Sequence, residues 1–103
     1  MSEYSDDVAK YTQNVNAAAV AAVVKYCGIA LRNADSALVS GSSPAELKTV
    51  RDGFASKKLG LSAEAAEAGL AAVLAKMKGA ARKSRVTFYY LLAEATGTLG
   101  KLS

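Results

Sequence analysis

The sequence predicts an all-α fold: a compact single domain, residues 1–103, built as a bundle of four or five short helices with a central apolar C-terminal helix. Three observations favour this fold. The chain contains 22 alanines and one proline, and alanine loses the least conformational entropy in a helix. Hydrophobic residues make up 51% and charged residues 21%, which suits one packed core. Apolar residues also recur every three or four positions, as helices with one buried face require.

The first helix is expected near the N-terminus, where Ser5 can act as N-cap and Asp6 and Asp7 complement the positive end of the helix dipole. Its apolar face comprises Tyr4, Val8, Tyr11 and Val15. The next apolar stripe is rotated by roughly 120° from this face, so one continuous helix does not account for both. We therefore expect a break at residues 14–16, with Asn16 as the N-cap of a second helix.

The second helix is expected to bury Val20, Val23, Val24 and Cys27. Gly28 offers a stop for this helix, but Leu31 would continue the same stripe, so its end stays open. The following segment, 33–43, is rich in Asn, Asp, Ser and Gly around Leu38 and Val39. It predicts a loop that a short helical turn holds to the core.

A third helix is expected to begin at Pro44, because Ser43 and Glu46 have the spacing of a capping box and proline suits the first helical position. Gly60 is expected to end it. Its predicted buried face comprises Leu47, Val50 and Phe54. Its predicted solvent face carries Glu46, Lys48, Arg51 and Asp52.

Two further helices complete the prediction. Ser62 is expected to cap the fourth helix, with Glu64 and Glu67 near its positive end. The buried stripe of that helix comprises Ala66, Leu70, Val73, Leu74 and Met77. The last helix, 86–95, has only Thr87 and Glu94 as polar interruptions, and a helix that is apolar on all sides belongs in the middle of a domain. Its strongest stripe comprises Phe88, Leu91, Leu92 and Ala95.

Catalytic chemistry has few candidate residues. Histidine is absent and Cys27 is the only cysteine, which excludes histidine-based catalysis, zinc clusters and intrachain disulfides. Cys27 lies in phase with the valine stripe, which predicts a buried structural thiol. The pairs Asp6–Asp7 and Glu64–Glu67 are typical of helix starts, and no phosphate-binding or dinucleotide-binding glycine motif occurs. We therefore expect no enzymatic activity, no cofactor and no metal site.

The sequence gives no sign of a membrane protein. The longest nearly apolar run, 17–24, is mostly alanine and far shorter than the roughly 20 residues that a membrane span needs. The first seven residues are acidic and polar, unlike a secretory signal. One unpaired cysteine suits a reducing compartment, so we expect a cytoplasmic protein.

The basic cluster, Lys76 to Arg85, is the feature that most suggests a ligand, because no acidic residue occurs between Glu67 and Glu94. Its candidate anion-binding residues are Lys78, Arg82, Lys83, Ser84 and Arg85. Two interpretations stay open. Cations at the start of the last helix would oppose its dipole, which a bound anion would reverse. Alternatively, the fourth helix runs on through Arg82 and these cations stabilise its C-terminus without a ligand.

These observations favour a non-enzymatic binding domain that acts on another macromolecule, with an unspecified protein partner. The alternative is binding of nucleic acid or another polyanion through the basic cluster, helped by tyrosines that could stack on bases. Four of the five tyrosines lie on or beside predicted core stripes, however, which favours packing. A DNA-binding helix-turn-helix with the last helix as recognition helix is not expected, because that helix offers almost no polar side chains to base edges.

Four blocks of the sequence carry a resemblance to a known family. They are Gly28–Arg32, Pro44–Arg51, Lys57–Gly60 and Lys83–Glu94. Together they resemble a family of small helical bacterial proteins classed as domain of unknown function 2853, over nearly the whole chain. The resemblance implies a bacterial cytoplasmic helical domain and transfers no catalytic or ligand-binding residue.

Overall fold

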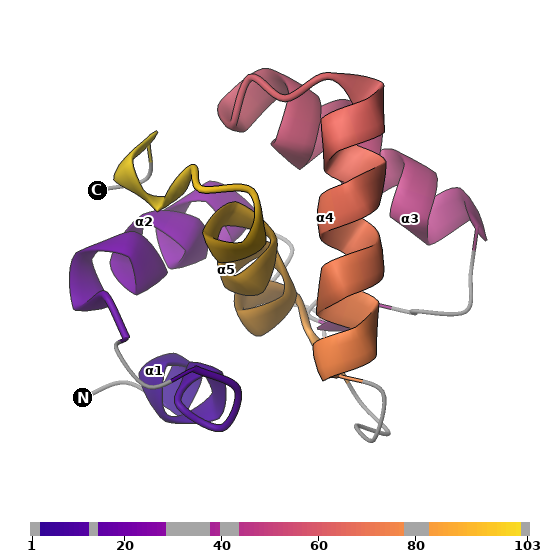
Figure 1. Ribbon diagram of the computed structural model, residues 1–103. Coiled ribbons are helices and arrows are strands. Elements are labelled where there is room, and N and C mark those ends of the chain that lie inside the picture. The colour runs from indigo at the N-terminus through magenta and orange to yellow at the C-terminus, as the bar shows by residue number, and fades with distance from the viewer. Residues whose placement is uncertain (1–2, 13–14, 29–37, 40–43, 78–82, 102–103) are drawn as a thin grey trace.

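The computed structural model describes residues 3–12, 15–28, 38–39, 44–77 and 83–101 (Figure 1). Its α-helices are α1 (Glu3–Val8), α2 (Ala17–Cys27), α3 (Pro44–Val50), α4 (Ala63–Lys76) and α5 (Arg85–Ala95). A π-helical segment, η2 (Arg51–Lys58), continues α3, and a 3-10 turn, η3 (Leu99–Lys101), follows α5. Two short strands, β1 (Leu38–Val39) and β2 (Lys83–Ser84), also occur. The all-α bundle is therefore confirmed.

Helix α5 forms the centre of the molecule, as the sequence predicts. It lies between α1 and α2 on one side and the pair α3 and α4 on the other (Figure 1). Every residue from Val86 to Ala93 is buried, and α5 packs against α1, α2, α4 and η2. Such an all-round apolar helix is stable only where other elements cover every face.

The predicted helix caps at Asn16 and Ser62 are confirmed. Asn16 Oδ1 accepts a hydrogen bond from the Ala19 amide at 3.1 Å, and Ser62 Oγ accepts one from the Ala65 amide at 3.2 Å. Helix α2 ends at Cys27, and its C-cap Gly28 has a φ of 38°, which favours glycine. The predicted cap Ser43 lies outside the described residues.

The loop around Leu38 differs from the prediction. Leu38 and Val39 form a strand instead of a helical turn, and they pair antiparallel with β2, with Leu38 opposite Ser84 and Val39 opposite Lys83. A two-residue apolar run has no periodicity of its own, so a distant backbone partner decides its conformation.

The third predicted helix ends before Gly60, which has a φ of 69°, as predicted. Its second half differs in register, because the chain widens into the π-helix η2. The Leu59 amide donates to the Phe54 carbonyl at 3.1 Å, five residues back. In an α-helix Ala55 and Leu59 would lie about 140° and 180° away from Val50. The π-helical register brings these residues and Phe54 into the core, where each is at most 1% exposed. Burial of this apolar group accounts for the change of register.

Candidate functional site

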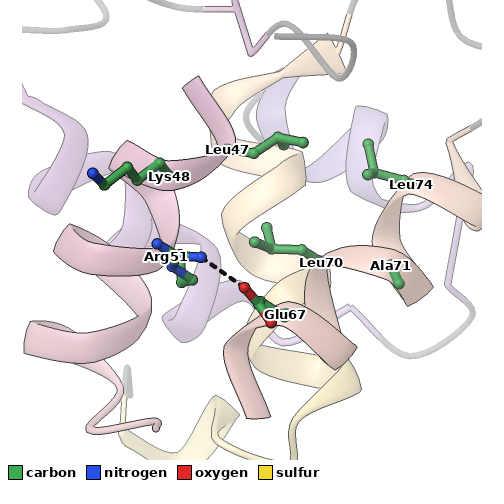
Figure 2. A pocket seen from close by; sticks show the side chains of 7 residues that line it. All are labelled: Leu47, Lys48, Arg51, Glu67, Leu70, Ala71 and Leu74. Atoms are coloured by element: carbon green, nitrogen blue, oxygen red, sulfur yellow. Dashed lines mark hydrogen bonds and ion pairs between the residues drawn. The ribbon is translucent and has the colours of Figure 1, made fainter. Parts of the chain in front are cut away.

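A groove lies between α3 and α4 among the described residues. It has a volume of about 320 Å³ and lies open to solvent. Figure 2 shows its lining side chains, which come from α3, the first turn of η2 and the middle of α4. They are Leu47, Lys48, Arg51, Glu67, Leu70, Ala71 and Leu74.

The floor and walls of the groove are apolar. Leu70 is buried, Leu47 and Leu74 are half-buried, and Ala71 is exposed. The sequence correctly places the three leucines on inward-facing stripes, but it does not reveal the gap between them. Whether two apolar stripes close on each other depends on how the helices pack, and no local pattern contains that information.

The charged side chains of the groove lie along its edge. Arg51 Nη1 donates to Glu67 Oε1 at 2.6 Å across the groove, and Arg51 Nε donates to Asp52 Oδ1 at 3.1 Å (Figure 2). The hydrogen bonds to Asp52 and Glu67 raise the pKa of Arg51. The prediction that Arg51 faces solvent is therefore only partly right, since its side chain is 26% exposed and tied to α4. Lys48 is exposed, and among the described residues it forms no ion pair.

The outer face of α4 beside the groove consists of small side chains. Ala68, Ala71 and Ala75 are exposed and recur at three- and four-residue spacing, so they form one continuous stripe along the helix. Ala71 belongs both to this stripe and to the groove wall. Because alanine side chains are small, the surface of α4 beside the groove has no large protruding side chain at these three positions.

The predicted anion site is only partly described. Lys78 and Arg82 lie outside the described residues. Lys83 and Ser84 form β2, and Arg85 is the first residue of α5. Helix α4 ends at Lys76, so the interpretation in which it runs on through Arg82 is wrong. Lys83 and Ser84 pair with β1, and α5 begins directly after them.

Arg85 is engaged with an aromatic cluster. Its Nη1 donates to the Tyr89 hydroxyl at 2.8 Å, and its guanidinium carbon lies 5.6 Å from the centre of the Tyr89 ring. The rings of Tyr89 and Phe54 are stacked, with their centroids 4.2 Å apart. The ring of Tyr26 meets that of Phe54 edge-on, with a centroid distance of 5.2 Å. Burial raises the pKa of Tyr89, with Arg85 acting in the opposite direction. Tyr26 is 44% exposed, whereas the other four tyrosines are buried or half-buried.

Lys76, the first residue of the basic cluster, forms an ion pair with Glu94. Lys76 Nζ lies 3.2 Å from Glu94 Oε1, and the other oxygen of Glu94 accepts from the Thr12 hydroxyl at 2.7 Å. Glu94 thus joins the end of α4 to the segment after α1. Asp7 has a similar role at the other end of α5, where it accepts a hydrogen bond from the buried Thr87 hydroxyl.

The sequence matches the model of a known protein family. A family model described as "Protein of unknown function (DUF2853)" matches residues 3–100. The chain belongs to this family. No curated protein matches the sequence.

Cys27 of this DUF2853 domain is buried, as predicted from its place on the valine stripe. Burial raises the pKa of its thiol to about 11, while the charge of Arg85 acts to lower it. The thiol is therefore protonated at neutral pH and is a poor nucleophile.

The described residues contain no metal-binding cluster and no membrane-spanning helix. Cysteine, aspartate and glutamate side chains nowhere gather there in a group of three that could hold a metal ion. In the same part of the chain, no helix has the length and hydrophobicity to cross a membrane.

Proposed function

We propose that this chain is a non-enzymatic interaction domain of the bacterial cytoplasm that binds another protein in the α3–α4 groove. The observation that carries the proposal is the apolar lining of the groove, where Leu70 is buried and Leu47 and Leu74 stay partly open to solvent. Covering these side chains would remove apolar surface from water, at about 25 cal/mol for each Å². The surrounding charges lie at the rim, as is usual for protein interfaces.

The non-enzymatic part of the proposal rests on the reactive groups. The chain has no histidine, and its one thiol is buried with a raised pKa. The carboxylates of Asp7, Glu67 and Glu94 each contact a neighbouring helix or segment, which supports a structural role for them.

The test compares two adjacent alanines of α4. Ala71 lines the groove, whereas Ala72 is also exposed and does not line it. The wild-type protein, Ala71→Glu and Ala72→Glu are each immobilised and exposed to a nuclease-treated lysate of the native host. We expect a protein that wild type and Ala72→Glu retain and Ala71→Glu loses. Equal retention by all three proteins, or equal loss in both variants, would contradict binding in the groove.

Polyanion binding through the basic cluster is the second candidate function. One observation favours it: Ser84, the N-cap of α5, makes no side-chain hydrogen bond to the helix, so an anion could accept from those first amides. Fluorescence anisotropy with a labelled single-stranded oligonucleotide tests this. About three neutralised phosphates predict a log–log salt slope near −2 to −3. Absence of binding at low salt, where such contacts are strongest, would exclude this function.

A further inference from the structure

We propose that the occupant of the α3–α4 groove is an amphipathic helix with an acidic residue beside its apolar stripe. This inference rests on the proposed function and names the chemistry of the partner. Three properties of the groove carry it: its position between two helices, the small side chains along α4, and the charges at its edge.

The shape of the surface suits a helix. Leu70 and Leu74 lie one turn apart on α4, and Leu47 faces them from α3 (Figure 2). A ridge of apolar side chains at three- and four-residue spacing on a partner helix matches this arrangement. The exposed stripe of Ala68, Ala71 and Ala75 beside the groove lets a helix backbone approach closely, because interhelical distances depend on the side chains at the contact.

The size of the groove limits what enters it. A cavity of about 150 Å³ holds a benzene ring, so about 320 Å³ accommodates roughly two apolar side chains of that size. Two side chains in the groove correspond to one or two turns of a partner helix. The rest of its apolar stripe would lie on the alanines of α4.

The charges favour an acidic partner. Glu67 is paired with Arg51 at 2.6 Å, so this carboxylate is already satisfied inside the chain. Lys48 is the lining residue that carries a charge without an ion pair among the described residues. A carboxylate on the partner would complement it, and the net charge of +4 would steer an acidic partner toward the domain.

The same charges argue against a second copy of this chain as the occupant. Two copies would each bring a net charge of +4, so their approach is opposed by like charge. The inference therefore commits to a different, acidic protein segment.

The experiment uses a display library of 16-residue helical peptides. The apolar positions vary among Ala, Leu, Ile, Met and Phe, and the flanking positions vary among Glu, Lys, Gln and Ser. Peptides are selected on the wild-type protein and depleted on Ala71→Glu. Their affinities are then measured for wild type, Lys48→Glu and Lys25→Glu. Lys25 is a matched control, because it is exposed on α2 and does not line the groove.

We expect the selected peptides to carry large apolar residues at helical spacing and glutamate on one flank. Lys48→Glu should weaken their binding about fivefold or more, which corresponds to about 1 kcal/mol for exposed charges, while Lys25→Glu leaves it nearly unchanged. A proline in the middle of a selected peptide should abolish binding, because it breaks the helix.

Three outcomes would overturn the inference. Selection of lysine-flanked or uncharged peptides, or of none, shows that the groove does not recognise an acidic helix. Equal effects of Lys48→Glu and Lys25→Glu show that only net charge matters. Sedimentation in which wild type dimerises and Ala71→Glu does not would assign the groove to a second copy. In each case the lysate comparison of Ala71→Glu with Ala72→Glu still decides separately whether a protein partner uses the groove.

Discussion

At the scale of single residues, Gly69 sets how closely α4 approaches α5. A Cβ atom at this position would lie 2.6 Å from Thr96 Cγ2 and 2.7 Å from Leu92 Cδ1. Leu92 is fully buried, and the Thr96 hydroxyl is held at 2.9 Å by the Leu92 carbonyl, so neither side chain moves freely. Glycine is therefore required here by a close approach between helices.

We expect Gly69→Ala to lower the free energy of unfolding by about 1–2 kcal/mol, because overpacking outweighs the gain of about 1 kcal/mol in helix propensity. Gly53→Ala is the matched control, since nothing lies within 4 Å of a Cβ at Gly53, and it should be neutral or stabilising. Urea denaturation followed by circular dichroism measures both. A stabilised Gly69→Ala would show that α4 and α5 have room to separate.

Cys27 provides a prediction about pH. Its pKa is raised from 9.0 to about 11 by burial, so folding favours the neutral thiol. The sign follows from linkage: the stabilising contribution is complete below pH 9 and is lost as the pH rises toward 11. We expect the free energy of unfolding of wild type to fall over this range more steeply than that of Cys27→Ala. The difference between the two proteins removes the effect of lysine and tyrosine titration, and parallel curves would contradict the burial of the thiol.

At the scale of helices, local capping decides where elements begin. Ser62 holds the first turn of α4 through its bond to the Ala65 amide. We expect Ser62→Ala to cost about 1 kcal/mol of unfolding free energy. Ser56→Ala is the control, because Ser56 is exposed inside η2 and should change stability little. Thermal denaturation of both variants compares them. An equal effect of the two substitutions would mean that the Ser62 cap does not stabilise α4.

At the scale of the whole molecule, α5 makes the domain one cooperative unit. It packs against helices from both halves of the chain, so neither half retains its core without it. Leu92 is 0% exposed, and Leu92→Ala should cost about 2–5 kcal/mol. Leu74→Ala, at a half-buried position, should cost less. Unfolding measured by circular dichroism and by tyrosine fluorescence should coincide in wild type. Two separate transitions would show that the halves fold independently.

Much of the fold could be predicted from the sequence because its determinants are local. A cap such as Asn16 or Ser62 binds an amide three residues away, and the buried stripes repeat within each helix. The central position of α5 follows from its own composition, because a helix with apolar residues on every side is stable only where other elements cover every side. These features need no knowledge of distant partners.

The sequence by itself therefore determined the helical class, the caps at Asn16 and Ser62 and the central helix, whereas tertiary packing decided the rest, including the start of α1 at Glu3 instead of after Ser5. The pairing of Leu38 and Val39 with β2, the π-helical register that buries Leu59, and the stacking of Tyr89 on Phe54 all join segments that lie far apart in the sequence. The groove likewise exists only because α3 and α4 meet with a gap between their leucines. The energies of such contacts depend on partners far along the chain, so periodicity and propensity do not contain them.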